Sequence, residues 1–452
     1  MPFSSDPLLF PLGTHCTNTS GIQGGRNLTA SHRRRNPRHR PLRIEPLEDR
    51  RLLASLTVNS LLDNTSSGDG LVTLREAIVA ANTDATTDLG HTGSGADTIE
   101  FAASLTSGGP ATILLTQGEL QISAALTING PGPNLLTVDA QQASRILNIT
   151  AATGNFTVRG ITLIHGRTIG DNGTLSISTF SGGAIRSVTT GSLTIDQCNI
   201  SENSTSGERA AGGGIFTERA LTITLSTVSG NSTAGTDARG GGIRTQFGGL
   251  TLTNSTVSGN STTGSGSRGG GISADTSVTL VQSTVSGNST VGSNADGGGM
   301  RIEGTLTLTH STVNGNSANG SGARGGGVWG SVFDPVTMAN SIVAGNTASG
   351  VSPDLGPSTP TATFSLIGDK SGTSLVEAPV GSPSASGNLI GGPVNGVINP
   401  LLGPLTDNGG PTLTRALLAG SPAIDGGRPG RGGRRRHGST IRSTRHSVRS
   451  SI

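Results

Sequence analysis

The ionisable residues of the central region are the first candidates for chemistry in this 452-residue chain. Hydrolysis of a polysaccharide needs clustered carboxylates, and lyase chemistry needs a carboxylate-bound calcium ion with a basic proton acceptor. The carboxylates of this region are scattered, and no two fall at one ladder position on adjacent copies of the local sequence repeat. They are Asp196, Glu202, Glu208, Asp237, Asp275, Asp296 and Glu303. Their spacing disfavours hydrolysis and calcium binding.

Arginines show a more regular spacing than the acids. Arg239 and Arg268 precede the same glycine triplet one repeat apart, and Arg324 holds that place two repeats beyond Arg268. Either of the first two is a candidate general base, but such spacing usually gives a column of solvated guanidinium groups. His165 and His310 have no histidine or cysteine at ligand spacing. We therefore predict no catalytic, cofactor-binding or metal-binding residues, and no cofactor.

A repeat of about 28 residues must position these side chains. Three glycines and an apolar residue recur at Gly212–Ile215, Gly240–Ile243, Gly269–Ile272, Gly297–Met300 and Gly325–Val328. One copy contains three short β-compatible runs, at Gly241–Arg244, Leu250–Thr253 and Ser255–Ser258. This period and the alternation of side chains predict an all-β fold, a single-stranded right-handed parallel β-helix with three short strands per turn.

The alternation also separates interior from exterior residues. Val257 is expected to face inward and Thr256 outward, so an aspartate should be tolerated at Thr256 but not at Val257. Cys198 falls in an inward column of serines. Stacked asparagine amides can hydrogen-bond along a column at the turn after the third run. The predicted structural ladders are Asn203, Asn231, Asn260, Asn288, Asn316, Asn346, Val228, Val257, Val285 and Val313.

Charge is distributed unevenly along the chain. Residues 1–51 carry nine arginines and four acids, and residues 428–452 carry eight arginines and no acid. The part between them carries thirteen arginines and one lysine against twenty-four acids. The high isoelectric point therefore comes from the two ends, and nucleic-acid binding by the folded part is not expected. No apolar run reaches the length of a transmembrane helix.

One helix is expected, over residues 71–82. Thr73 and Glu76 have the spacing of a capping box, and Leu74, Ala77 and Ile78 form an apolar stripe. An amphipathic helix before a β-solenoid can cover the open end of its core and protect the first strand edge. We therefore interpret this helix as an N-terminal cap.

Three segments of the N-terminal and central parts resemble known families. Residues 43–54 resemble the Leu-Glu-Pro-Arg-type sorting motif of planctomycete secreted proteins, because Glu48 and Arg50–Leu53 stand in the expected order. Residues 71–82 resemble the Cys-Ser-Leu-Arg-Glu-Ala domain at the start of bacterial surface β-helices, with Val72 in place of the cysteine. Gly182–Ile185 and Val228–Asn231 are similar to repeats of the polymorphic outer-membrane proteins.

The C-terminal part resembles a fourth family. Pro400–Pro411 and Gly420–Gly426 look like the choice-of-anchor type Q domain, and the likeness ends where an arginine-rich stretch begins. The predicted organisation follows from these resemblances and from the repeat. It comprises an arginine-rich leader with the sorting motif at 1–54, a cap region at 55–112, β-helix repeats at 113–350, a choice-of-anchor-like region at 351–427 and a basic disordered tail at 428–452.

The resemblances imply a bacterial protein exported to the cell surface and associated with the outer membrane. We expect a non-catalytic monomer with an adhesive or envelope role, whose partner is a surface glycan or a protein. The alternative is a polysaccharide lyase or glycoside hydrolase, because many β-helices of the pectin-lyase type cleave acidic polysaccharides. Three acids brought within one ligand sphere would favour the enzyme.

Overall fold

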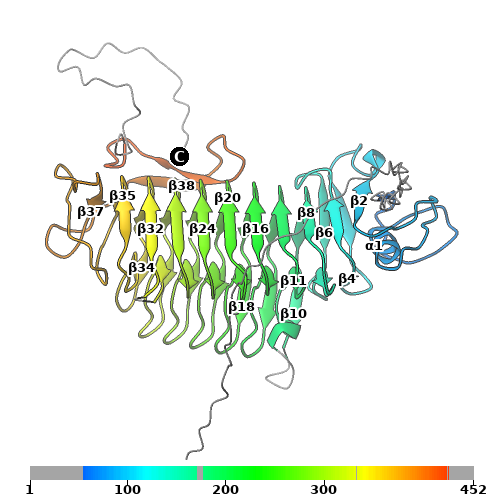
Figure 1. Cartoon of the computed structure of the whole chain (residues 1–452), viewed down its shortest axis with the longest axis horizontal. Helices are drawn as coiled ribbons and strands as arrows, with labels where there is room; N and C mark the ends of the chain where they lie inside the picture. Colours follow the sequence, from blue (N-terminus) through cyan, green and yellow to red (C-terminus); the bar gives the residue numbers. More distant parts are fainter. Residues whose placement is uncertain (1–53, 171–176, 332, 425, 427–452) are drawn as a thin grey trace, which may run out of the picture. The chain divides into compact units, whose positions relative to one another are not determined.

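The computed structural model describes residues 54–170, 177–331, 333–424 and 426. It confirms the predicted fold class: parallel strands stack into a right-handed β-solenoid of about nine turns, each of roughly 28 residues. Figure 1 shows the turns side by side, with helix α1 at the N-terminal end. The expectations for the leader, most of the sorting motif and the basic tail lie outside the described residues.

The strands of the solenoid form four parallel sheets, numbered I to IV in the order in which the chain passes through them within one turn. Sheet I contains β4 (Leu120–Ile122), β7 (Leu147–Ile149), β11 (Ile185–Ser187), β15 (Ile215–Thr217), β19 (Ile243–Thr245), β23 (Ile272–Ala274), β27 (Met300–Ile302) and β31 (Val328–Trp329). Sheet II contains β1 (Ser55–Val58), β2 (Asp97–Phe101), β5 (Leu126–Asn129), β8 (Phe156–Arg159), β12 (Leu193–Asp196), β16 (Leu221–Thr224), β20 (Leu250–Thr253), β24 (Val278–Val281), β28 (Leu306–Thr309), β32 (Val336–Ala339) and β35 (Thr361–Thr363).

Sheets III and IV complete each turn. Sheet III contains β3 (Ala111–Leu114), β6 (Leu136–Asp139), β9 (Thr162–Ile164), β13 (Asn199–Ser201), β17 (Thr227–Ser229), β21 (Thr256–Ser258), β25 (Thr284–Ser286), β29 (Thr312–Asn314), β33 (Ile342–Ala344), β36 (Leu366–Ile367) and β37 (Leu389–Ile390). Sheet IV contains β10 (Arg167–Ile169), β14 (Ser204–Ser206), β18 (Ser232–Ala234), β22 (Ser261–Thr262), β26 (Ser289–Thr290), β30 (Ser317–Ala318) and β34 (Thr347–Ala348). Two 3-10 helices lie at Ala103–Leu105 and Ile177–Phe180.

Each central turn thus has a fourth strand besides the three expected runs. In the copy that starts at Gly240, the expected runs contain β19, β20 and β21, and β22 follows Asn260. Strand β22 has two residues and pairs in parallel with β18 and β26. A strand of this length shows no apolar alternation, so the sequence pattern did not reveal it.

The interior is a set of columns in register along the solenoid axis. Val228 pairs with Val257, Val257 with Val285 and Val285 with Val313, and all four are fully buried. The asparagine column is buried as well. The backbone N–H and Nδ2 of Asn231 both donate to Oδ1 of Asn260, at 2.9 Å each. These bonds join neighbouring turns and leave no buried amide of the column without a partner.

An aspartate ends the asparagine column. Oδ1 of Asp354 accepts from the backbone N–H and the Nδ2 of Asn346, at 3.0 and 2.8 Å, and Oδ2 accepts from the backbone N–H of Asp369 at 2.7 Å. Burial raises the pKa of Asp354 to about 7, although these three donors act in the opposite direction. The column therefore ends with the carboxyl group of Asp354, which accepts the hydrogen bonds that an asparagine amide accepts at the earlier positions.

Helix α1 covers Leu74–Thr83 and is shorter at its start than the expected 71–82. Val72 is held in extended structure, because its carbonyl accepts from the N–H groups of Asn59 and Ser60. Thr73 is the N-cap and forms the predicted capping box with Glu76. The buried face of the helix packs against β1, β2 and β4, which supports its role as a cap.

The stacked sheet begins earlier than the predicted boundary at residue 113. Strand β1 pairs in parallel with β2, and β2 pairs with β5, so sheet II extends back to Ser55. Helix α1 lies in the long insertion between β1 and β2. This insertion lengthens the first turn and hides the repeat in the sequence.

A C-terminal hairpin corrects the expectation for Thr256. Strands β38 (Leu402–Thr406) and β39 (Thr414–Leu417) form an antiparallel pair over the outer face of sheet III (Figure 1). Oγ1 of Thr256 donates to the carbonyl of Leu413 at 2.7 Å, and Nε of Arg415 donates to Oγ of Ser286 at 2.7 Å. Thr256 points outward but is fully buried, so the prediction that it tolerates a charge was wrong.

Candidate functional site: an arginine cluster

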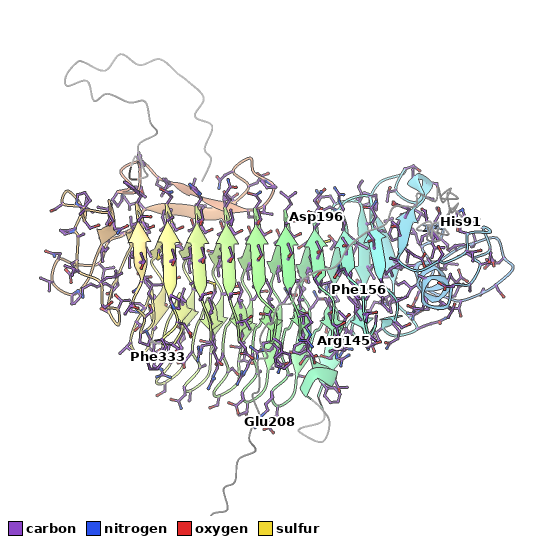
Figure 2. All side chains as sticks on the ribbon, viewed as in Figure 1. His91, Arg145, Phe156, Asp196, Glu208 and Phe333 are labelled. Atoms are coloured by element: carbon purple, nitrogen blue, oxygen red, sulfur yellow. The ribbon has the colours of Figure 1, made fainter. Side chains whose placement is uncertain are left out.

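The acids of the central region do not form one carboxylate site. Figure 2 shows Asp196 and Glu208 on opposite sides of the solenoid. Asp196 ends β12 and pairs with Arg159 at 3.1 Å, and Glu208 pairs with its neighbour Arg209 at 3.8 Å. Among the described residues, no group of three or more histidines, cysteines or acids is placed to hold a metal ion.

The arginine column before the glycine triplets exists, but an acid interrupts it. Isolated backbone bridges pair Arg239 with Arg268 and Arg268 with Asp296. Asp296 is buried and accepts three hydrogen bonds from Arg324, from its backbone N–H at 3.2 Å, from Nε at 3.1 Å and from Nη2 at 2.8 Å. The guanidinium of Arg324 in turn lies over the ring of Trp329, 4.4 Å from its centroid.

A second column of polar side chains lies on sheet I beside the first. Arg244, Ser273 and Arg301 are the middle residues of β19, β23 and β27 and pair in register. Arg244 is buried, and its Nη1 donates to Oδ1 of Asp275 at 2.7 Å while its Nη2 also binds that carboxylate. This part-buried ion pair connects two neighbouring turns.

Two acids occupy equivalent positions on adjacent turns, just outside the ladder positions to which the expectation from sequence applied. Asp275 and Glu303 directly follow the paired residues Ala274 and Ile302, which end β23 and β27. The expectation considered only the ladder positions inside the strands. These acids lie one residue beyond the strands, where the chain turns toward sheet II.

The two arginine columns and these two acids form one network, here called the arginine cluster. It consists of Arg239, Arg244, Arg268, Arg301, Asp275 and Glu303. Arg239 lies 3.7 Å from Asp275, Arg268 lies 3.4 Å from Glu303, and Arg301 lies 3.2 Å from Glu303. Four guanidinium groups thus share two carboxylates, so the cluster carries an excess of positive charge.

The pKa values of the arginines reflect this excess of positive charge. Burial lowers the pKa of Arg239, and the nearby charges of Arg244 and Arg268 lower it further. Burial also lowers the pKa of Arg301, where Glu303 raises it and Arg268 lowers it. Arginine side chains nevertheless stay charged at neutral pH, which makes them poor general bases. The cluster is suited to holding an anion rather than to moving a proton.

His165 and Cys198 lie apart from the arginine cluster in the sequence and have other partners. His165 Nδ1 is 3.0 Å from Asp139 and its Nε2 is 3.2 Å from Glu202. Burial lowers the pKa of His165, but the hydrogen bonds and charges of both carboxylates outweigh it and raise the pKa overall. Burial raises the pKa of the Cys198 thiol to about 12, so this cysteine is a packing residue.

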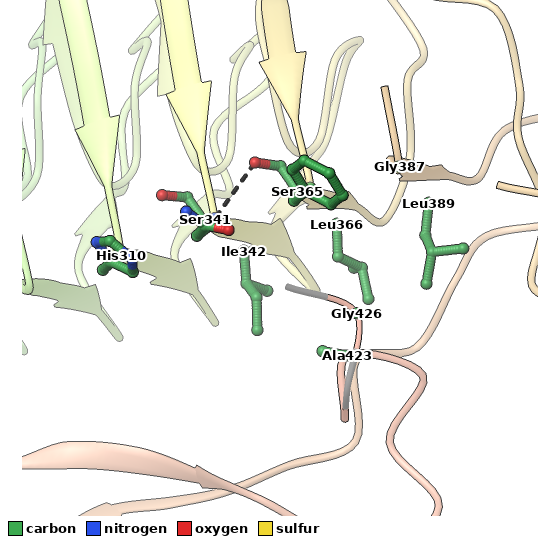
Figure 3. Close-up of a pocket in the computed structure, with 11 residues that line it drawn as sticks. His310, Ser341, Ile342, Ser365, Leu366, Gly387, Leu389, Ala423 and Gly426 are labelled. Carbon is green, nitrogen blue, oxygen red and sulfur yellow. Dashed lines mark hydrogen bonds between the residues drawn. The ribbon is translucent and has the colours of Figure 1, made fainter. Parts of the chain in front are cut away.

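Two of the cavities near the C-terminal end of the solenoid include strand residues in their lining. One, of about 380 Å³, lies where Ile342, Leu366 and Leu389 of sheet III face Ala423 (Figure 3). It is a seam between the sheet and the segment after the hairpin. The other, of about 600 Å³, is lined by Trp329, Pro353 and Asp369 among others. Neither cavity contains a residue of the arginine cluster.

Comparisons with known proteins give no relative. No protein-family model matches the chain, no curated protein matches it, and no solved structure matches it. Within the described part of the chain, no helix is long and apolar enough to cross a membrane.

Proposed function

We propose that the chain is a non-catalytic, exported cell-surface protein that binds a partner through the arginine cluster. One observation carries this proposal: one face of the β-solenoid groups four arginines with two acids, and two of these arginines, Arg239 and Arg268, are accessible from solvent. The stacked strands fix the positions of the arginines, which reduces the ordering cost of binding. An adhesive or envelope role in association with the outer membrane, with a surface glycan or protein as partner, fits such a surface.

Export is supported by sequence resemblance. Residues 43–54 resemble the planctomycete sorting motif, and the segment around α1 resembles the Cys-Ser-Leu-Arg-Glu-Ala domain of bacterial surface β-helices. The central repeats are similar to those of polymorphic outer-membrane proteins, and Pro400–Gly426 resembles the choice-of-anchor type Q domain. All four resemblances belong to proteins that function outside the cytoplasm.

The state of the carboxylates favours binding over catalysis. Asp275 and Glu303 are each held by arginines, and Asp296 is bound by Arg324. A glycosidase requires two carboxyl groups on either side of the scissile bond, and a calcium-dependent lyase requires carboxylates open to the metal. Carboxylates in arginine ion pairs serve neither purpose well.

Fractionation of producing cells tests the proposal. The full chain should appear in the envelope or in the medium, and external protease should degrade it on intact cells while a cytoplasmic marker survives. Recovery in the cytoplasm alone would overturn the proposal. Cleavage of polyuronate by the purified chain, with loss of that activity in Arg268→Gln, would favour the lyase instead.

A further inference from the structure

We infer that the arginine cluster is a binding site for the sulfate groups of a sulfated polysaccharide. This inference rests on the proposed function and adds the chemical class of the partner. It depends on the unused hydrogen-bond donors of the cluster, on the charge of its surroundings and on the direction in which its arginines are spaced.

The two outer arginines have donors to spare. The side chain of Arg239 makes no hydrogen bond to any described residue, and its one ion pair, with Asp275, spans 3.7 Å. Arg268 donates one long bond, at 3.4 Å, to Glu303. Their side chains are 35% and 37% exposed, so both are accessible from solvent. A guanidinium has five N–H donors, and most of those on this pair are free for a ligand.

Arg301 adds a donor that the protein leaves unsatisfied. Its Nη1 donates to the carbonyl of Ile302 at 2.8 Å and its Nη2 faces Glu303, whereas Nε is buried without a hydrogen-bond partner. A buried donor without an acceptor costs free energy. A ligand oxyanion that draws this side chain outward would satisfy Nε, which favours the bound state.

The surroundings restrict where an anionic polymer can bind. Residues 52–427 carry fourteen basic and twenty-four acidic residues, so the solenoid as a whole repels polyanions. The cluster reverses this sign locally, with four arginines against two acids. An anionic chain is therefore attracted to this part of the solenoid and repelled from most of the remainder.

The spacing of the arginines suits a polymer that lies along the solenoid axis. Arg239 and Arg268 are one turn apart, and Arg324 stands two turns beyond Arg268 at the same position. Adjacent strands are about 4.8 Å apart, so the three arginines extend over roughly 14 Å. Repeated anionic groups on one polymer chain can contact several of them at once.

The geometry favours sulfate over carboxylate and over nucleic acid. The free donors belong to two neighbouring columns, one before the glycine triplets and one on sheet I. A sulfate ester offers three terminal oxygens in a tetrahedral arrangement, whereas a carboxylate offers two oxygens in one plane, which a single guanidinium can satisfy. The aromatic residues next to the cluster on sheet I, Phe216 and Trp329, are buried, so they offer no exposed ring on which a base would stack.

Binding of the purified full chain to dextran sulfate tests the inference. Neutral dextran, polygalacturonate and polyphosphate are compared at the same low ionic strength. The variant Arg239→Gln/Arg268→Gln should bind dextran sulfate at least about tenfold more weakly and lower the salt dependence by about two counterions. Glu303→Gln should bind more tightly, because it removes a competing carboxylate.

Two matched variants control for charge alone. Arg159→Gln/Arg209→Gln also removes two solenoid arginines, 50% and 58% exposed, each paired with one acid. Arg434→Gln/Arg435→Gln removes two arginines from the basic tail. Both should bind within about twofold of the unmodified chain, since neither changes a residue of the cluster. Circular dichroism and thermal unfolding verify that all variants are folded.

The inference fails if the cluster variant and the controls weaken binding equally, or if no variant matters. It also fails if polygalacturonate or polyphosphate binds as tightly as dextran sulfate. Its failure is distinct from that of the proposed function. If the chain is found at the cell surface but does not bind dextran sulfate, only the inference is contradicted. If the chain is found only in the cytoplasm but binds dextran sulfate, only the proposed function is contradicted.

Discussion

The inward face of sheet III and the outward face of sheet I show two ways in which the same repeat is used. On sheet III, one valine follows another through Val228, Val257, Val285 and Val313, all fully buried. On sheet I, Phe216, Arg244, Ser273, Arg301 and Trp329 pair in register on successive strands. Each interior residue meets the same neighbours in every turn, so identity is favoured there. Residue types vary more on the outside, and that is where the arginine cluster lies.

The first prediction tests the interior face and should have the largest effect. Val257→Asp places an unpaired charge in the middle of a buried column, which should lower the free energy of unfolding by more than about 4 kcal/mol. Thermal or chemical denaturation measures the change. Thr251→Asp, on the outward face of β20, is the matched control and should cost less than about 1 kcal/mol. Similar losses in both variants would contradict the assigned faces.

The second prediction concerns the aspartate that ends the asparagine column. The folded-state pKa of Asp354 is raised to about 7, whereas the unfolded chain has the ordinary value of 3.8. Between about pH 4 and 7 the folded state therefore holds a proton that the unfolded state releases. Its contribution to the free energy of unfolding should fall as pH rises, by up to about 1.4 kcal/mol per unit and a few kcal/mol in all.

Denaturation at several pH values tests this prediction. Asp354→Asn removes the titration, so the difference between unmodified chain and variant isolates Asp354 from other groups, including His165. The fall in stability between about pH 4 and 7 should be smaller in the variant. Equal slopes in both proteins would show that Asp354 is ionised in the folded state throughout.

The third prediction tests the column itself. Asn260→Ala deprives the backbone N–H of Asn231 of its acceptor, and the carbonyl of Val228 of a donor. These groups are buried, so the free energy of unfolding should fall by about 2 kcal/mol. Asn319→Ala, at an exposed position, should leave stability unchanged. An equal melting temperature for all three proteins would mean that the amide column does not contribute to stability.

The fourth prediction concerns the outer face of sheet III, which faces outward but is covered by the hairpin. Thr256→Val keeps the shape of the side chain but removes its bond to the carbonyl of Leu413. Docking of the hairpin should weaken by about 1 kcal/mol, and trypsin should cleave after Arg415 faster. Thr253→Val on sheet II provides the control. Cleavage at the same rate in both variants would indicate that this hydrogen bond does not hold the hairpin.

The fifth prediction concerns the arginine cluster, where we expect substitution to have the smallest effect on stability, in contrast to the buried position of Val257. Arg239 and Arg268 make only long ion pairs and are about one-third exposed. Arg239→Gln/Arg268→Gln should change the free energy of unfolding by no more than about 0.5 kcal/mol. Denaturant titration measures it beside Val257→Asp. A large loss would make the cluster part of the scaffold.

The interior could be predicted from the sequence because each column repeats. The spacing of Val257 and Asn260 from the equivalent residues of neighbouring repeats indicated the strand register and which side chains point inward. The capping box of Thr73 and Glu76 located the start of α1 to within a few residues. The strand β22 could not be predicted in this way. Its two residues are too few to show a period, and it is ordered by pairing with neighbouring turns.

The arginine cluster was only partly visible in the sequence. The spacing of Arg239 and Arg268 indicated a column, but Arg244 and Arg301 went unnoticed because Ser273 lies between them in register. An arginine directly after the apolar residue of alternate glycine triplets was the available signal. The burial of Thr256 had no local signal, since its cover comes from residues 412–413, more than 150 positions away.

Protection of arginines from chemical modification tests directly whether the arginine cluster binds sulfate groups. The full chain is treated with phenylglyoxal with and without dextran sulfate, and modified peptides are quantified by mass spectrometry. Dextran sulfate should protect Arg239 and Arg268, while Arg159 and Arg209 should react at the same rate in both samples. Protection of Arg159 and Arg209 without protection of Arg239 and Arg268 would contradict binding at the cluster.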